Sequence, residues 1–300
     1  MTSQGALRGI AVMLALLTSS ATHSQSSAPL NIAGIAKAMG AEGAVSGAMY
    51  RVSIPRSDLT VKVGGVPIKP ALALVNWAGF VKSGSSAVCY GDLVLLEDEI
   101  NPVISKLEDK GIELSALHNH LLHETPRIMY IHFTGHGDEV AMAQALRDAL
   151  ALTKTPLGAS PAASAPPKAK PELAAQIEKI IGVDGSMSGG VFHIAVPRSD
   201  IQVMAMGAAI PSSMGMNTPL NFQFDGNNAA INGDFILLPS EVNPVTKALR
   251  ANNIEIVSVH NHMLDEEPRL TFLHFWANDD AIALAKGLRA ALDQTGSKRN

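Results

Sequence analysis

A 142-residue internal repeat constrains the fold of this chain more than any other feature. Residues 43–150 align with residues 185–292 without a gap, and 40 of the 108 aligned positions are identical. The string "HNHLLHETPRIMYIHF" at 118–133 returns as "HNHMLDEEPRLTFLHF" at 260–275. A repeat of this length has the size of a domain rather than of a solenoid unit. The sequence therefore predicts two tandem homologous domains.

Each copy shows the same order of secondary-structure patterns. A short helical pattern is followed by four strand-like runs, an amphipathic helix, two more strand-like runs and a closing helix. This order predicts an α+β fold, a mostly antiparallel sheet with flanking helices. We expect the first domain at 30–152 and the second at 172–296. Residues 153–171, rich in Pro, Ala and Ser, predict a linker.

The first 24 residues predict a secretory signal peptide. Arg8 precedes the apolar run "IAVMLALL", and small polar residues follow it. This run is much shorter than the roughly 20 residues of a membrane span. We therefore expect a periplasmic or secreted protein without a transmembrane anchor. The net charge of −4 and the lack of a basic stripe argue against nucleic acid as a partner. The single cysteine, Cys89, aligns with Ile231, which favours a buried structural role.

Three histidines recur in each copy at positions that strand geometry brings together. Because side chains alternate along a strand, we expect the even-numbered residues from Ile112 to His120 on one face. A short hairpin leads to the strand that carries His132. If His118 lies opposite His132, three imidazoles meet within about 5 Å. The predicted metal ligands are these histidines and one glutamate in each copy: His118, His120, Glu124, His132, His260, His262, Glu266 and His274.

Three nitrogens and a carboxylate suit a divalent transition metal such as Zn, Cu, Fe or Mn. Two alternatives stay open: a site for a non-metal ligand or for proton transfer, and histidines that only stabilise the sheet by hydrogen bonding. The sequence does not decide whether the copies hold two sites or share one. Enzyme activity is also undecided, and no catalytic residue is assigned. Metal-activated water is the chemistry expected if the protein is an enzyme.

Other charged motifs recur with the same period. Arg127 and Arg269 follow a proline beside the histidines, and each could orient the glutamate or clamp an anionic ligand. The motif "PRSD" at 55–58 and 197–200 predicts structural ion pairs. The motif "GD" at 91–92 and 233–234 is expected in a turn.

Two Met-x-Met pairs occur in the second copy alone. Thioethers are soft ligands that suit Cu(I), whereas methionine also fills gaps in apolar cores. Both interpretations apply to the same four residues: Met204, Met206, Met214 and Met216.

Several strings resemble the LppY/LpqO family of exported bacterial proteins. They are "YRVSIPRSDL", "GDLVLL", "HNHLLHETPR", "HNHMLDEEPR", "LHFWA" and "LAKGLRAAL". The resemblance implies export and a duplicated region, and it assigns no activity. This chain departs from the lipoprotein members because no cysteine follows the apolar run. The first copy also departs from the second at His123 and Thr125, where the second has Asp265 and Glu267.

Our leading hypothesis from the sequence is an exported metal-binding protein with duplicated histidine sites and a metal ion or small molecule as its partner. The alternative is a non-catalytic cell-envelope module that binds a small anionic or glycan ligand without metal.

Overall fold

The computed structural model describes residues 29–158, 170–212 and 214–297. The predicted signal peptide at 1–24 and most of the predicted linker lie outside these residues. The described part forms two α+β domains of the same design, as the repeat predicts. None of its helices is long and apolar enough to span a membrane.

The first domain contains a six-stranded antiparallel sheet in the order β1-β2-β5-β6-β9-β7. Its strands are β1 (Gly43–Ser46), β2 (Met49–Pro55), β5 (Val75–Ser83), β6 (Ser86–Leu96), β7 (Glu113–His118) and β9 (Ile128–Gly137). The short strands β3 (Lys62–Val63), β4 (Val66–Pro67) and β8 (Glu124–Thr125) form a small second sheet. The helices are α1 (Ile32–Met39), α2 (Pro70–Ala73), α3 (Ile100–Glu108) and α4 (Glu139–Leu150).

The second domain repeats this topology with the sheet order β10-β11-β14-β15-β17-β16. Its strands are β10 (Gly185–Ser188), β11 (Val191–Pro197), β14 (Asn217–Asp225), β15 (Asn228–Leu237), β16 (Glu255–His260) and β17 (Thr271–Asp280). A hairpin of β12 (Val203–Ala205) and β13 (Ala208–Ile210) stands beside the sheet. The helices are α5 (Glu172–Ile181), α6 (Val242–Ala251) and α7 (Ala281–Leu292).

Local sequence signals set several of the helix ends. Helix α1 begins after Asn31, whose side chain accepts from the Gly34 N–H, and ends at Gly40 in the left-handed region at φ 66°. The closing helices α4 and α7 are capped by Asp138 and Asp280, which lie 142 residues apart. The same capping chemistry therefore starts the same helix in both domains.

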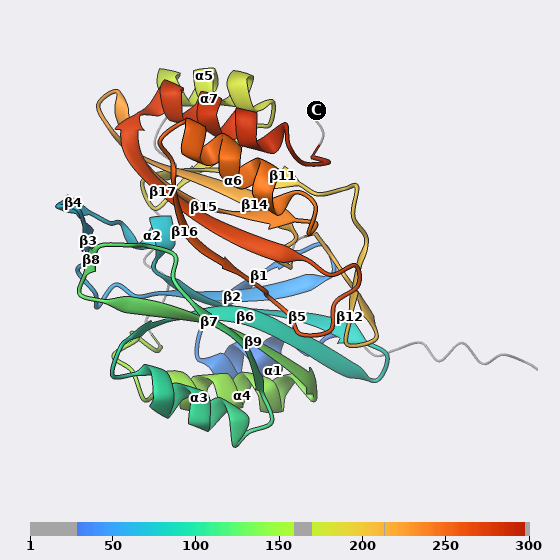
Figure 1. Cartoon of the computed structure of the whole chain (residues 1–300). Helices are drawn as coiled ribbons and strands as arrows, with labels where there is room; N and C mark the ends of the chain where they lie inside the picture. The colour runs from blue at the N-terminus through green and yellow to red at the C-terminus, as the bar shows by residue number, and fades with distance from the viewer. Residues whose placement is uncertain (1–28, 159–169, 213, 298–300) are drawn as a thin grey trace, which may run out of the picture.

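The molecule has four layers, in which two sheets face each other and helices cover their outer faces (Figure 1). Each domain has its own apolar core between its sheet and its long helices. Cys89 is buried in the first of these cores, and burial raises the pKa of its thiol. The inner faces of the two sheets are therefore left to pack against each other.

Two mixed apolar clusters join the inner faces. One combines Met49 and Tyr90 of the first domain with Ile236 and Phe272 of the second. The other combines residues such as Tyr130 with Trp276. Burial of apolar area of this kind is the main force that holds packed layers together.

Hydrogen bonds between the domains lock the register of the two edge strands. Ser115 Oγ donates to the His262 carbonyl at 2.6 Å, and Asn261 Nδ2 donates to the Ser115 carbonyl at 2.8 Å. A second bond from the second domain to the first joins Ser258 Oγ, as donor, to the Asn119 carbonyl at 2.8 Å.

A β-bulge in β7 changes which side chains share a face of the sheet, in contrast to the prediction. The pairing of β7 with β9 shifts between Leu114 and Ala116, so Leu114 lies opposite Phe133 whereas His118 lies opposite Tyr130. Leu114 packs on the core under the helices, and the prediction that it shares a face with His118 is wrong. The predicted pairing of His118 with His132 is also wrong, since His132 pairs with Ala116. The extra residue reverses the alternation of side chains and turns His118 toward the other domain.

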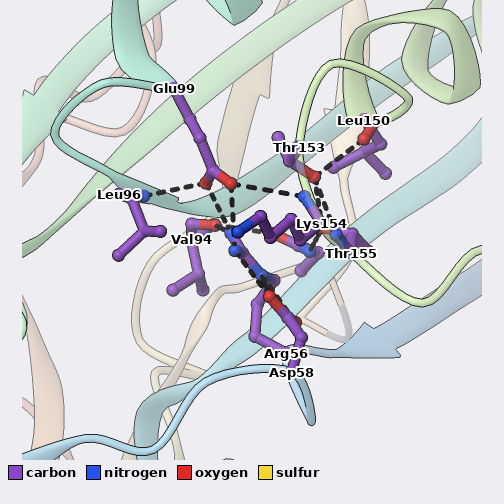
Figure 2. Close-up of polar contacts among 10 residues, drawn as sticks. Arg56, Asp58, Val94, Leu96, Glu99, Leu150, Thr153, Lys154 and Thr155 are labelled. Carbon is purple, nitrogen blue, oxygen red and sulfur yellow. Dashed lines mark hydrogen bonds and ion pairs between the residues drawn. The ribbon is translucent and has the colours of Figure 1, made fainter.

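The "PRSD" motif forms the ion pairs that the sequence predicts, and it recruits a third residue. Arg56 is fully buried and binds Asp58 at 2.9 Å and Glu99 at 2.8 Å. Figure 2 shows the same guanidinium at the Val94 carbonyl, with Glu99 also accepting from the Leu96 N–H. Arg198 makes the equivalent contacts with Asp200 and Glu241 in the second domain. The motif therefore ties the end of β2 or β11 to the helix that follows the central strand.

Candidate functional site

The inner faces of the two sheets bring histidines and aspartates from both domains into one group. Asp92 on β6 lies directly opposite His132 on β9, and Asp234 on β15 lies opposite His274 on β17. Residues opposite each other in an antiparallel pair point to the same side of the sheet. The histidine–aspartate cluster, as we call it below, contains His118, His120, His132, His260, His262, His274, Asp92 and Asp234.

The six imidazoles of the cluster are related by an approximate two-fold axis. The ring centroids of His118 and His260 lie 4.0 Å apart and are nearly parallel. His118 lies 5.4 Å from His274, and His132 lies 5.4 Å from His260. The distances from His120 to His274 and from His132 to His262 are 3.8 and 4.0 Å. Exchanging the domains returns nearly the same set of distances, and the rings of both copies form one cluster.

Backbone carbonyls orient one histidine in each domain. Nδ1 of His132 lies 3.1 Å from the Gly91 carbonyl, and Nδ1 of His274 lies 2.9 Å from the Gly233 carbonyl. A ring that donates its Nδ1 proton to a carbonyl presents an unprotonated Nε2, the form that binds metal. Nε2 of His132 and Nε2 of His274 are buried without a hydrogen-bond partner among the described residues.

An aspartate lies close to a second histidine in each domain. Nε2 of His120 lies 3.1 Å from Asp92 Oδ2, and Nε2 of His262 lies 3.0 Å from Asp234 Oδ2. Each aspartate therefore lies close to the histidine from the loop after β7 or β16 and opposite another histidine on the neighbouring strand.

Burial keeps most of these groups in their neutral forms. It lowers the pKa of His132 to about 3 and that of His274 to about 4. The pKa of His118 is also well below its usual value, because of burial and of the neighbouring imidazoles. Burial raises the pKa values of Asp92 and Asp234 well above the usual range. Burial therefore favours the neutral forms of the histidines and of the two aspartates.

Three overlapping groups within the cluster have the ligand types and spacing of a metal site. Each group has one ligand atom per residue, and these atoms lie within 4.8 Å of one another. Two nitrogens bound to the same zinc ion at about 2.1 Å can be at most about 4.2 Å apart. The ligand atoms of each group would therefore have to lie somewhat closer together to bind one ion. The groups are His118–His260–His274, His132–His260–His262 and Asp92–His118–His132.

The two predicted glutamate ligands have partners other than the histidines of the cluster. Glu124 and Glu266 are buried, and neither belongs to a metal-type group among the described residues. Each accepts a hydrogen bond from a backbone N–H four residues later. Each also lies 3.5 Å from an exposed arginine, Arg127 or Arg269. Of the two roles considered for these arginines, the observed contacts correspond to orienting the glutamate.

The four methionines of the second domain lie in and beside an apolar cluster. Met214 lies in a turn and Met216 directly before β14, and both are buried in the apolar cluster between the sheets. Met206, in the β12–β13 turn, is partly buried and packs against this cluster. Met204 is exposed.

The sequence analysis missed Asp92 and Asp234 as site residues. The prediction that each "GD" motif lies in a turn is wrong, because both motifs lie inside long central strands. A repeated carboxylate within an apolar strand was the available signal, since a buried charge needs a partner. Tyr90 was also missed, and its hydroxyl lies 3.1 Å from Nδ1 of His132. The second domain has Asn232 at that position.

A family model described as "Domain of Unknown Function (DUF1259)" matches residues 33–152 and again residues 175–294. A search of curated proteins finds no match.

Two solved structures show a weak likeness to this chain. One is the trimeric bacterial microcompartment shell protein PduB, with 14% identity, 83% of this chain and 90% of that chain covered, and a TM-score of 0.20. The other is EtuB from Clostridium kluyveri, with 11% identity, the same two coverages and a TM-score of 0.18.

Proposed function

The chain belongs to the DUF1259 family in both of its halves, and we propose from the geometry of its site that it binds a divalent transition metal in the histidine–aspartate cluster. The observation that carries the proposal is the convergence of three overlapping ligand groups on one buried place between the domains. Histidines that only stabilised the sheet would satisfy their ring nitrogens within the protein. Here His118 Nδ1, His132 Nε2 and His262 Nδ1 are buried without a hydrogen-bond partner among the described residues.

The donor set supports some metals better than others. Two of the groups contain three histidines, and the third contains two histidines and a carboxylate. Imidazole-rich sites suit Zn, Cu and Fe, whereas Mn prefers more oxygen ligands. The carbonyls of Gly91 and Gly233 would fix the ring orientation in the way that supports metal ligation elsewhere.

We also propose that the protein acts outside the cytoplasm, in the periplasm or as a secreted protein. The support is the signal-peptide pattern of the first 24 residues. The resemblance to the LppY/LpqO proteins stays a prediction of the same kind.

Elemental analysis of the full mature chain, purified without a His tag or chelator, tests the metal proposal. We expect about one or two equivalents of one transition metal. The variant His118→Phe/His260→Phe keeps two stacked rings at the axis but removes their nitrogens, so we expect it to fold and to lose the metal. The matched control is His123→Asp/His136→Asn, which replaces two exposed histidines by the residues of the second copy.

The control should keep its metal, because it retains every histidine of the cluster. Absence of metal from the wild-type protein, with no uptake on dialysis against Zn, Cu, Fe or Mn salts, would overturn the proposal.

A further inference from the structure

A large cleft leads from the surface to the histidine–aspartate cluster. Its volume is about 1500 Å³, and both domains line it at equivalent positions. Its inner end includes His120 and Asp92 of the first domain and their partners His262 and Asp234 of the second. The approximate two-fold axis of the imidazoles therefore also passes through the cleft.

The two walls of the cleft have diverged from each other. The first domain contributes Arg51, Ser53 and Trp77. The second contributes His193, Ala195 and Pro219 at the positions 142 residues later. One wall thus presents a guanidinium and an indole where the other presents an imidazole and an apolar ring.

Arg51 is a half-buried cation that forms no ion pair with any residue in the described part of the chain. Its guanidinium lies 4.0 Å over the Trp77 ring, and its Nε donates to Ser53 Oγ at 3.3 Å. Its two terminal nitrogens have no hydrogen-bond or ion-pair partner among the described residues. Burial lowers its pKa to about 10, with Tyr90 and Asp92 acting in the opposite direction, so the side chain is charged at neutral pH.

The other basic groups near the cleft are less suited to hold an anion there. Lys69 is exposed and donates to the Gly190 carbonyl at 2.8 Å. Arg127 and Arg269 do not line the cleft, and each faces a glutamate. An anion that enters the cleft therefore meets Arg51, whose free edge has the fork geometry that binds carboxylate or phosphate with two parallel hydrogen bonds.

We infer that this cleft binds an organic oxyanion, a carboxylate or a phosphate ester, with the charged group on Arg51 and the organic part extending beside Trp77 toward the cluster. The volume exceeds the roughly 300–1000 Å³ of ordinary small-molecule sites, which favours an organic molecule over a free inorganic ion. This inference names the ligand class for the proposed metal site and in that respect rests on the proposed function, whereas the contact with the anion belongs to Arg51 itself.

Equilibrium dialysis of the metal-loaded full chain against four probes tests the inference. The probes are benzoate, phenyl phosphate, inorganic phosphate and neutral benzamide. We expect benzoate or phenyl phosphate to bind at least tenfold more tightly than inorganic phosphate and benzamide. Comparing benzoate with phenyl phosphate distinguishes a carboxylate site from a phosphate-ester site.

Arg51→Gln should weaken binding of the preferred probe at least tenfold, because it removes the charge and the fork. Arg127→Gln is the matched control and should change the affinity less than twofold. The inference is overturned if no organic probe binds, if Arg51→Gln binds like the wild type, or if inorganic phosphate binds as well as the organic probes.

The metal content of each sample is measured separately by elemental analysis. A wild-type chain that lacks metal would overturn the proposed function and leave the Arg51 comparison intact. A chain that holds metal but binds probes independently of Arg51 would overturn only the present inference.

Discussion

The imidazoles of His118 and His260 stack at a centroid distance of 4.0 Å across the interface between two domains that are 142 residues apart in sequence. Each histidine is the last residue of the edge strand of its own sheet, β7 or β16. Every group of metal-type ligands among the described residues contains at least one of these two histidines. Two of these groups combine residues of both domains, so a metal ion held there would need the pair of domains, whereas Asp92, His118 and His132 all belong to the first domain.

Asp234→Asn should weaken metal binding about 10- to 100-fold, and Asp92→Asn at least as much, because Asp92 also belongs to one of the metal-type groups. Each carboxylate lies within about 3.1 Å of one histidine and opposite another, so each change disturbs the same contacts in its own domain. Competition with a chelator of known affinity measures the effect, and Asp98→Asn, an exposed change, is the control. Unchanged affinity in both cluster variants would contradict this role.

The metal-free protein should lose stability as the pH falls from about 7 toward 4. Histidines of the unfolded chain titrate near pH 6.5, whereas the pKa of His132 is about 3 and that of His274 about 4 in the folded chain. The unfolded state therefore binds more protons in this range, and the free energy of unfolding decreases. Urea unfolding at pH 7.5 and pH 5.0 at constant ionic strength measures the difference.

The aspartates act in the opposite direction. Their raised pKa values give stability that is fully present below the unfolded value near 4 and is lost as the pH rises toward the folded value. The Asp92→Asn/Asp234→Asn variant should thus show a steeper gain in stability between pH 5.0 and 7.5 than the wild type. Equal slopes in the two proteins would argue against protonated aspartates in the folded state.

Arg56→Met should destabilise the first domain by about 3–5 kcal/mol, because it leaves Glu99 buried without its partner. Arg198→Met should have a comparable effect on the second domain, where Glu241 loses the same contact. Urea unfolding monitored by circular dichroism measures both, with the exposed change Lys62→Met as control. A loss below about 1 kcal/mol would show that these buried ions are solvated or re-paired.

Gly91→Ala should destabilise the protein by about 3 kcal/mol or more, because a Cβ there would lie 2.1 Å from the Trp77 carbonyl. The shift needed to relieve this contact would also move the carbonyl that orients His132, so metal affinity should fall as well. Gly135→Ala is the control in the same sheet, since the atom nearest to its Cβ would be Sδ of the flexible Met142 side chain at 3.0 Å, with Ile112 at an ordinary contact distance of 3.5 Å. Thermal unfolding and metal titration of both variants check the prediction.

The repeat made the domain count and the order of elements predictable, because both follow from local patterns that occur twice. The approach of His118 to the other histidines was predicted for the wrong reason. Simple alternation of side chains placed His118 on the same face as Leu114. The bulge at Ser115 separates the two, and no local residue pattern predicts it. A bulge depends on the pairing with β9, and such pairing is a property of the folded sheet.

The shared site could not be deduced from the sequence either. Packing of one sheet on the other depends on the shape of two whole faces, and the linker between the domains carries no information about their orientation. Asp92 and Asp234 were overlooked because Gly-Asp commonly forms turns. Their place in central strands follows from the length of the neighbouring strands and from the glycines, whose missing Cβ lets the strands approach.

The covalent connection of the two copies has a consequence for how such a site can change. In an assembly of two identical chains, any substitution in the cleft would appear on both walls at once, and two guanidiniums at the Arg51 position would face each other across the axis. In the fused chain, position 51 can carry arginine while position 193 carries histidine. Each copy mutates independently, so the cluster can stay symmetric while its entrance distinguishes one end of a ligand from the other.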